Sequence, residues 1–536
     1  MSNRVEFNSE TKTWSGPKVP YPFGNKSTGQ VIYESMKTNL NHICQVSDDS
    51  GEIYTNERML KEAISFANHL KLIGIKRGDT AIMLTHNHHY MAPTWLGCVF
   101  AGVLICPFGL IEGSVKEEII ELVNQLKPSF MVTSYINEIQ RFKEVFKQLN
   151  VECPIYIYDN QFEDCFDLKP LLETKVNIYN FKPVSIINSD TDIFMITLSS
   201  ATTSKPKLIN VTHKQFLLGG LDQVSNYTIA TTLIPGWQTE AVILFNCLQK
   251  CHRRIIRAFH NEVDFLKLLE KHKVTFAFVK PRDIFMMTNS DLIKSIDLSE
   301  LIIVVSFGAH LAPVVANNFK QYIPNGIVVS IFGMSEIGMS VADASDIEEN
   351  IPNLVGKVKR NMHLRVRGEN SNQYLGPNEI GEICVKADAS FGGYYKNAKL
   401  TEANTTRDGF FLTDDLGYLD KEGNIFLVDR RKYVFSYRGN IIQTTQIEQI
   451  IREHVRGVEN VCVVDIEHEE HGLYPVIAIV PQVGAELDEH VIVDTVMKNH
   501  PFKFETKVFF MKQFPMTISG KIKKHVVRSN IKKLEI

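Results

Sequence analysis

Amphipathic helices alternate with short apolar strands along the first part of the chain. Residues 56–74 place Leu60, Ile64 and Leu70 at helical spacing, and a second helix is predicted over 115–126. The apolar runs 80–84 and 128–133 have the length of strands. This order is typical of parallel sheets covered by helices. Because 536 residues exceed what one hydrophobic core supports, two or more domains are expected.

The pattern changes near residue 380 to short strands separated by turns, which predicts a small antiparallel, barrel-like element. After residues 429–432 come a helix over 445–454, strands over 461–464 and 474–480, and a helix over 491–498. The expected fold is α/β. A large N-terminal domain (1–428) has two helix-covered, mostly parallel sheets and a small β-barrel-like subdomain, and a hinge (429–432) leads to a small mobile α/β domain (433–536).

Charge and cysteine content exclude several classes of protein. The 58 basic and 61 acidic residues nearly balance, which argues against a nucleic-acid groove as the binding surface. Nine cysteines occur without a CxxC pair, which favours free thiols in a reducing compartment. Cys247 and Cys251 share one face of a predicted helix, and two small buried residues are a better interpretation than a metal pair.

One uncharged segment, residues 90–111, is as long as a membrane span. Pro93, Gly97 and Gly102 interrupt it, so a short helix followed by a buried strand is predicted, and no transmembrane segment is expected. The polar start of the chain predicts no signal peptide. The tail, 533–536, is not a Ser-Lys-Leu peroxisomal address. An intracellular location is expected.

Two distant segments carry groups that suit a polyphosphate. Lys521 lies in the stretch Pro515-Met-Thr-Ile-Ser-Gly-Lys-Ile-Lys-Lys. Far upstream, the apolar strand 193–198 is followed by Ser-Ser-Ala-Thr-Thr-Ser-Lys-Pro-Lys, residues 199–207. Hydroxyls and backbone amides in such a loop donate hydrogen bonds to phosphate, and the lysines neutralise its charge. A lysine docked over that phosphate can stabilise charge that develops during a reaction.

Five separated motifs occur in a fixed order: 199–207, 306–311, 330–336, 413–415 and 428–432. With Lys521 they resemble the motifs of the adenylate-forming superfamily, which includes acyl-CoA ligases, 4-coumarate–CoA ligases and firefly-type luciferases. The resemblance runs from about residue 29 to residue 528. Each motif is weak by itself, and their order makes the resemblance specific.

The resemblance implies a role for each matched residue. Lys521, Ser335 and Lys432 are expected to be catalytic, and Glu336 to hold Mg²⁺. Phe332 is expected to stack on adenine, and Asp415 and Arg430 to bind the ribose. The acid pocket is expected to include Trp237, Gln238, Gly338 and Met339. The remaining residues expected to bind ATP or CoA are Ser199, Ser200, Thr202, Thr203, Lys207, Gly308, Ala309, Gly333, Arg438 and Gly439.

Several positions depart from the family pattern. Side chains replace family glycines at Ala201, Ser204, Leu208, Ile331 and Asp414. A side chain costs about 1–2 kcal/mol where a left-handed conformation is required, which weakens binding roughly tenfold if the cost falls on the bound form. In the C-terminal domain, Ser436 replaces a family lysine that serves the thioester-forming step, and Ile441 replaces a family glutamine. The sequence therefore supports thioester formation less strongly than adenylation.

The resemblance implies an ATP-dependent carboxylate–CoA ligase for a medium- or long-chain fatty acid, with ATP, Mg²⁺ and coenzyme A as its small-molecule partners. Relatives are often peroxisomal, so a peroxisomal location competes with a cytoplasmic one. Two alternatives stay open. One is a luciferase-like monooxygenase that shares the adenylation step, because a fold does not decide chemistry. The other is a catalytically weakened protein that binds nucleotide or acyl chains.

Overall fold

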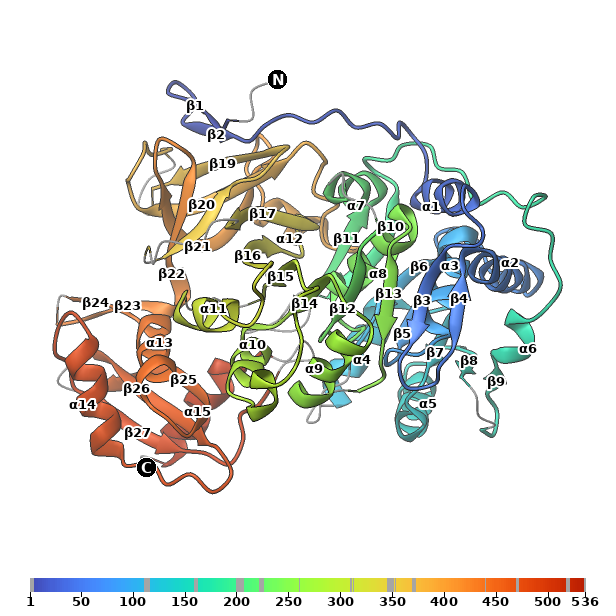
Figure 1. Ribbon diagram of the computed structural model, residues 1–536. Coiled ribbons are helices and arrows are strands. Elements are labelled where there is room, and N and C mark those ends of the chain that lie inside the picture. The colour runs from blue at the N-terminus through green and yellow to red at the C-terminus, as the bar shows by residue number, and fades with distance from the viewer. Residues whose placement is uncertain are drawn as a thin grey trace.

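The computed structural model describes residues 4–109, 116–158, 162–198, 207–220, 226–259, 261–308, 311, 313–344, 351, 353–368, 373–438, 440–468, 472–516 and 521–534. Within these residues the chain forms three sheets, named here A, B and C (Figure 1). Sheets A and B belong to the N-terminal part and sheet C to the C-terminal part.

Sheet A combines a parallel half with an antiparallel half. Strands β3 and β12–β16 pair in parallel, and β16–β22 continue the same sheet in antiparallel pairs. In spatial order its strands are β1 (Glu6–Asn8), β2 (Thr13–Ser15), β19 (Met362–Arg367), β20 (Gly381–Ala387), β21 (Phe411–Leu419), β22 (Asn424–Arg430), β18 (Leu354–Val358), β17 (Met339–Ala344), β16 (Ile327–Met334), β15 (Ile303–Ser306), β14 (Phe276–Val279), β12 (Thr228–Thr231), β13 (Arg253–Ile256), β3 (Ile43–Ser47) and β4 (Ile53–Thr55).

Sheet B is parallel except for the pair β10–β11. Its strands, in spatial order, are β11 (Leu208–Thr212), β10 (Ile193–Leu198), β6 (Leu104–Pro107), β5 (Thr80–Leu84), β7 (Phe130–Thr133), β8 (Ile155–Ile157) and β9 (Phe166–Asp167). Helices α2 (Asn56–Leu72) and α3 (Met91–Ala101) share a core with strands of sheet B and β3 and β4 of sheet A, where Trp95 of α3 and Phe66 of α2 are fully buried. Parallel strands covered on both faces read as continuous apolar runs, as predicted for 80–84.

The helices of the N-terminal part cover both sheets (Figure 1). A core on the outer face of sheet B holds side chains of α4 and α5, and another on sheet A holds those of α9, α10 and α11. These helices are α1 (Thr28–Lys37), α2 (Asn56–Leu72), α3 (Met91–Ala101), α4 (Lys116–Leu126), α5 (Ile139–Gln148), α6 (Lys169–Leu172), α7 (His213–Gly219), α8 (Gln238–Lys250), α9 (Glu262–Lys271), α10 (Pro281–Thr288), α11 (Pro313–Lys320) and α12 (Ala398–Ala403).

The C-terminal part has a hydrophobic core of its own. Sheet C contains β24 (Asn440–Gln443), β23 (Val434–Tyr437), β26 (Gly472–Pro481), β25 (Val458–His468) and β27 (Lys507–Phe510), with helices α13 (Thr444–His454), α14 (Glu489–Asn499) and α15 (Lys524–Leu534). In Figure 1 this domain, in orange and red, follows β22 and lies beside α10 and α11. The short helix Arg431–Tyr433 joins it to β22.

Most sequence expectations for the fold are confirmed. The helix predicted over 56–74 is α2, and the uncharged segment 90–111 contains α3 followed by β6. In the described part of the chain, no helix is long and apolar enough to cross a membrane. Two expectations need correction. The antiparallel strands form no closed barrel among the described residues, because they extend sheet A. Cys251 follows α8 as its left-handed cap (φ 53°), so it does not continue the helical face of Cys247.

Candidate active site

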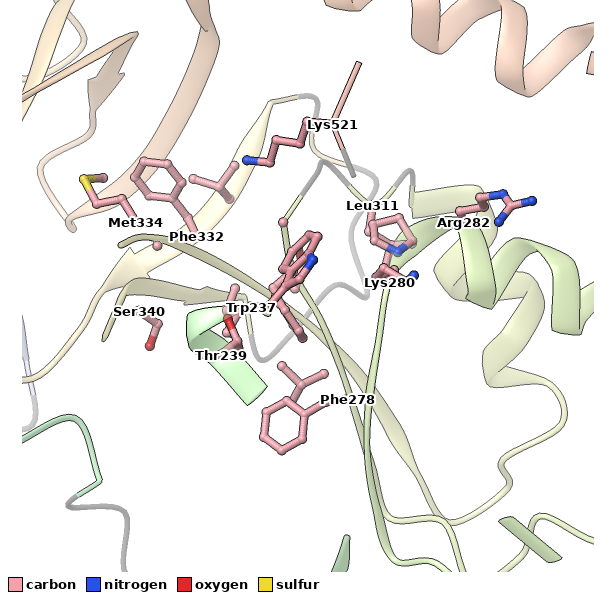
Figure 2. A pocket seen from close by; sticks show the side chains of 18 of the residues that line it. Trp237, Thr239, Phe278, Lys280, Arg282, Leu311, Phe332, Met334, Ser340 and Lys521 are labelled. Atoms are coloured by element: carbon pink, nitrogen blue, oxygen red, sulfur yellow. The ribbon is translucent and has the colours of Figure 1, made fainter. Parts of the chain in front are cut away.

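A cavity of about 3010 Å³ lies where the carboxyl ends of the central strands of sheet A meet the C-terminal domain. Lys280 follows β14, Gly308 follows β15 by one residue, and Ser335 follows β16; all three line the cavity. Ligands of open α/β sheets bind in crevices at this end of the strands. Lys521 enters the cavity from the C-terminal domain, and Figure 2 shows its amino group extended toward Phe332.

Lys521 lies among charged groups of the N-terminal part. Burial lowers the pKa of Lys521 to about 8, and the nearby Arg430 cation adds to this effect, while Asp415 and Glu336 oppose it. A lysine from the C-terminal domain and three residues from distant motifs are therefore close enough to interact electrostatically. The sequence prediction that Lys521 meets the nucleotide motifs is in accord with this arrangement.

Asp415 and Arg430 form an ion pair across neighbouring strands. The two residues are direct partners in the register of β21 and β22, and Arg430 Nε lies 3.0 Å from an Asp415 carboxylate oxygen. The Asp415 charge raises the pKa of Arg430. The Asp415 side chain is nearly buried, and it lines the cavity with one carboxylate edge engaged by Arg430. The free edge can accept hydrogen bonds from a diol, which suits a ribose.

The hinge residues connect the cavity to the C-terminal domain. Asp429 is the penultimate residue of β22, and its carboxylate accepts hydrogen bonds from the backbone N–H and the hydroxyl of Thr445 (3.2 and 2.9 Å). Burial raises the pKa of Asp429 to about 6. Lys432 lines the cavity, and burial followed by the Arg430 charge lowers its pKa to about 8. Two lysines with lowered pKa values thus face the same cavity.

Glu336 lies in the turn between β16 and β17. Its carboxylate accepts a hydrogen bond from the hydroxyl of Tyr394 (3.3 Å), and Lys207 Nζ lies 5.3 Å from the centre of the Tyr394 ring. Burial, and then the Glu336 charge, raises the pKa of Tyr394, so its hydroxyl remains a donor. Glu336, Lys207 and Tyr394 all line the cavity. This group places one carboxylate and one cation where a metal–polyphosphate can bind.

Gly308 and Trp237 bring two predicted subsites into contact. Gly308 has φ +87°, and a Cβ atom built there would lie 3.0 Å from the Trp237 ring. Both the conformation and the packing therefore require glycine at this position. Gly308 was expected at the adenine wall and Trp237 in the acid pocket, so these two predicted subsites adjoin. Trp237 lines the cavity (Figure 2), and it is half-buried against the apolar cluster that contains Phe307.

Gln238 begins α8 and presents an unpartnered donor. Its Oε1 accepts a long hydrogen bond from the Thr197 hydroxyl (3.5 Å), and among the described residues its buried Nε2 has no hydrogen-bond partner. Gly338 (φ +74°) lies against the Gln215 side chain and lines the cavity with Gln238. Met339 begins β17, and its side chain lies outside the described part.

The structure separates the replaced glycines into two kinds. Leu208 is a buried residue of β11 and Ile331 lies in β16, and neither has a positive φ. The expected conformational cost therefore does not arise at these two positions. Asp414 does have the left-handed conformation (φ +63°), and it forms an ion pair with Arg431 at 3.1 Å. Asp tolerates this conformation better than most residues. Ala201 and Ser204 lie outside the described residues.

Some predicted residues are not brought to the cavity or cannot be placed. Arg438, which was expected to bind cofactor, does not line the cavity. It lies in the β23–β24 turn and forms an ion pair with Glu505 at 3.0 Å. The predicted residues outside the described ones are Ser199, Ser200, Thr202, Thr203, Ala309 and Gly439. Phe332 and Gly333 line the cavity as expected.

Sequence reasoning missed two residues of the site. Tyr394 contacts Glu336 because an isolated bridge joins Ile209 to Tyr394, which brings the segment after β20 next to β11. Glu118, in the first turn of α4, also lines the cavity. A glycine pair before Tyr394 hints at a special backbone, but nothing in the local sequence connects Glu118 with Lys521.

The lowered lysine pKa predicts an alkaline limit on activity. An ordinary lysine titrates near 10.5, and burial moves Lys521 to about 8, so its charged form is lost as pH rises through 8. We expect kcat/KM for ATP to fall above pH 8, measured as pyrophosphate release. In Lys521→Arg, whose cation does not titrate in this range, the decrease should flatten. A decrease that persists in Lys521→Arg and disappears in Lys432→Arg would assign it to Lys432.

Comparisons with known proteins agree with this geometry. The model of the AMP-binding enzyme family matches residues 32–395, and that of the AMP-binding enzyme C-terminal domain matches residues 446–521. The chain is 26% identical to 4-coumarate–CoA ligase 1 of Petroselinum crispum over 509 residues, which covers 91% of each chain. It is 24% identical over 540 residues to luciferin 4-monooxygenase of Photuris pensylvanica, covering 97% of this chain and 98% of the relative.

Among solved structures, the anthranilate CoA ligase AuaEII in complex with anthranoyl-AMP matches with a TM-score of 0.82 at 16% identity, covering 96% of this chain and 99% of that one. This likeness supports the fold. The first family model spans more than half of the chain, and the resemblance predicted from the order of the motifs is confirmed. The chain belongs to the AMP-binding enzyme family, within the adenylate-forming superfamily.

Proposed function

We propose that the protein is an ATP-dependent carboxylate–CoA ligase that forms an acyl-adenylate and then a CoA thioester, acting on a medium- or long-chain fatty acid. The observation that carries the proposal is the position of Lys521, which enters one cavity with Asp415, Arg430 and Glu336. The CoA ligases among its relatives support the reaction class.

The described groups have a distinct role toward each part of ATP. Asp415, oriented by Arg430, accepts hydrogen bonds from the ribose hydroxyls, and Phe332 lies against the adenine beside Gly308. Lys207 and the Ser335 hydroxyl bind phosphate oxygens. Glu336 suits Mg²⁺, because this ion takes one or two carboxylates together with phosphate oxygens and water. When bound, the ion neutralises charge on the leaving pyrophosphate. The loop 199–206 stays a predicted part of this site.

In the first step, a carboxylate oxygen of the acid attacks the α-phosphorus, and the bond from that phosphorus to pyrophosphate breaks. The Lys521 ammonium, preorganised in the cavity, contacts both the attacking carboxylate and an α-phosphate oxygen, where negative charge accumulates. Gln238, which lines the cavity at the start of α8, orients the carboxylate. These groups bind and position, and none needs to accept a proton.

In the second step, the thiol sulfur of coenzyme A attacks the acyl carbon, and the bond between that carbon and the phosphate oxygen breaks. AMP leaves with that oxygen, and the thiol proton passes to water. We infer that the C-terminal domain rotates about residues 429–432 between the steps and withdraws Lys521. Ser436 and Ile441 face each other across β23 and β24, and Ile441 is 62% exposed.

The acid subsite continues as a channel between α8 and sheet A. On α8, Val242, Asn246 and Lys250 recur every fourth residue after Gln238, so they share one face, and all line the cavity. The opposite wall is apolar and comes from alternate residues of the strands: Tyr227, Phe276, Phe278, Ile303, Val305 and Ile331.

The length of this channel supports an aliphatic acid. At a rise of about 1.5 Å per residue, Asn246 lies about 12 Å along α8 from Gln238. An extended chain advances roughly 1.2 Å per bond, so an acyl chain of about ten carbons spans that distance. Mainly apolar walls favour a hydrocarbon chain, because its burial is favourable at each methylene. The channel thus supports a medium-chain or longer acid.

A substrate panel tests the proposal. Fatty acids of increasing length and aromatic acids should be compared by pyrophosphate release, with and without coenzyme A. We expect release with aliphatic acids of about ten carbons and formation of the matching thioester when coenzyme A is present. A preference for aromatic acids at every concentration would overturn the aliphatic assignment and leave the ligase assignment standing.

Narrowing the channel should change the preferred chain length. Val242→Phe places a ring about 6 Å from Gln238 along α8, so long chains lose their path while short chains still fit. We expect kcat/KM for ten-carbon and longer acids to fall about tenfold or more, the equivalent of a few unfavourable methylene contacts, with a four-carbon acid little affected. Val242→Ile, which adds one methylene, is the matched control. An equal loss at every length would place the acid elsewhere.

The luciferase alternative rests on the similarity to luciferin 4-monooxygenase. It shares the first step, and light emission with luciferin in place of CoA-dependent AMP release would favour it. The alternative of a catalytically weakened protein rests on Ser436, Ile441 and the replaced loop glycines. Two of the replaced glycines no longer support this alternative, because Leu208 and Ile331 lie in regular strands. Absence of pyrophosphate release with every acid would favour this alternative.

A further inference from the structure

An ion pair joins the two domains beside Lys521. Lys523 Nζ lies 2.6 Å from Glu118 Oε1, and the two side chains are only 12% and 17% exposed. Glu118 is in the first turn of α4, which packs on sheet B, and 405 residues separate the pair in sequence. Glu118 lines the same cavity as Lys521. The contact therefore crosses the domain boundary next to the predicted reaction centre.

The backbone around Lys523 connects this ion pair with Lys521. The Lys523 N–H donates to the carbonyl of Pro515 (2.8 Å), and a β-bridge pairs Met516 with Ile522. Lys521 thus directly precedes a bridged residue, and Lys523 directly follows it. Because only two peptide units separate Lys523 from Lys521, the position of the Lys523 side chain restricts the position of Lys521. Glu118 is in this way able to fix where Lys521 stands.

The neighbouring lysine shows that this orientation is specific. Lys524 points into its own domain, where Nζ lies 2.7 Å from Glu448 and 3.0 Å from the Thr444 hydroxyl. Burial alone would lower the pKa of Lys524, yet the Glu448 charge outweighs it and the pKa is raised. Consecutive lysines therefore bind opposite domains: Lys524 anchors the segment to the C-terminal domain, and Lys523 anchors it to α4.

Glu118 depends on Lys523 for its charge compensation. Its second oxygen, Oε2, is buried and has no hydrogen-bond partner, so Lys523 is the cation that neutralises this carboxylate in the part of the chain that the structure describes. Leaving a carboxylate partly buried without its cation is unfavourable. Separation of the domains breaks the pair and exposes both groups to water. The pair therefore favours the arrangement in which Lys521 occupies the cavity.

We propose that Glu118 and Lys523 are positioning residues, which hold the C-terminal domain in the adenylation pose and place Lys521 for the first half-reaction. The proposal rests on the proposed function. It predicts an asymmetric effect, because the second half-reaction proceeds after Lys521 is withdrawn. Loss of the pair slows adenylation and leaves thioester formation from supplied acyl-adenylate unchanged or faster.

The test measures the two half-reactions separately in Glu118→Gln, Lys523→Gln and Glu118→Lys. We expect ATP–pyrophosphate exchange to fall about fivefold in the two neutral variants, the size of a well-placed ion pair, and more in Glu118→Lys, where two lysines face each other. The exchanged pair Glu118→Lys/Lys523→Glu should recover most of the loss. Thioester formation from added acyl-adenylate should not decrease in any neutral variant.

A readout independent of catalysis accompanies the kinetics. Trypsin cleaves after Arg431 and Lys432 in the hinge, and a larger open population should raise the cleavage rate in Glu118→Gln, where no cleavage site is added or lost. The matched control is Lys116→Gln/Glu144→Gln, which removes an exposed pair (3.2 Å) also anchored on α4 but contained in the N-terminal part. This control should leave exchange and hinge cleavage unchanged. Thermal unfolding identifies variants that fail to fold.

Each outcome decides between support and rejection. Slower exchange, preserved thioester formation and faster hinge cleavage support the proposal. Unchanged exchange and cleavage in Glu118→Gln would overturn it, as would equal loss in both half-reactions, which is the mark of a merely structural contact. If the wild-type protein forms no adenylate with any acid, the proposed function fails, and the cleavage measurement alone still shows whether the pair holds the domains together.

Discussion

Lys521→Ala is expected to lower the rate of ATP–pyrophosphate exchange by about 10²–10³-fold, the usual loss when one preorganised donor is removed from developing charge. The physical reason is that no other described lysine enters the cavity from the C-terminal domain within range of both Asp415 and Glu336. The loss should appear mainly in the turnover rate, because the ammonium acts on charge that forms during the reaction.

Two controls make this result specific. Lys521→Arg keeps the positive charge but not the geometry, so it should retain more activity than alanine and less than the wild type. Thioester formation from supplied acyl-adenylate should be nearly unaffected in Lys521→Ala, because Lys521 is withdrawn for that step. An exchange rate equal to that of the wild type would remove Lys521 from the reaction.

The second large effect is expected at the ribose. Asp415→Asn should raise KM for ATP about 10–100-fold, because hydrogen bonds to charged groups contribute about 1.5–3 kcal/mol. The carboxylate is nearly buried and held 3.0 Å from Arg430, so its free edge has a defined direction toward the cavity. The measurement is pyrophosphate release at varied ATP concentration, with thermal unfolding to identify loss of the fold.

A nucleotide lacking one hydroxyl separates ribose binding from a general disturbance. In the wild type, 2′-deoxy-ATP should bind more weakly than ATP, since one acceptor of Asp415 is left unpaired. In Asp415→Asn this difference should shrink, as expected for two partners of one interaction. If the variant discriminates between the nucleotides as strongly as the wild type does, Asp415 does not bind this hydroxyl.

Local patterns predicted the elements well and their assembly less well. The helix over 56–74 and the strand over 80–84 follow from spacing within a few residues, and both were found. The short strands after residue 380 were correctly expected to be antiparallel, but their closure into a barrel was not found in the described residues. Whether an antiparallel ribbon closes or extends a sheet depends on the strand beside it, here β16.

The candidate site divides in the same way. Glu336, Asp415, Arg430 and Lys521 stand in motifs whose order along the chain already joins them to one chemistry. The conformation of the replaced glycines was not readable from the motifs. Ile331 is an ordinary strand residue paired with Asp343, whereas Asp414 has the left-handed conformation where the register of β20 and β21 is irregular. The contact of Gly308 with Trp237 likewise joins two motifs that the sequence assigns to separate subsites.

The sequence by itself determined the alternation of helices and strands, the presence of a separate C-terminal domain and the chemical identity of the groups in the adenylate-forming motifs. Each of these depends on residue types and on spacings of a few residues. Only the tertiary structure decided that Glu118 meets Lys523, that Val242 and Asn246 of α8 line the cavity and that Arg438 lies outside it. Those facts depend on how surfaces that are distant in sequence are brought together. Such contacts produce no periodic pattern of residue types along the chain.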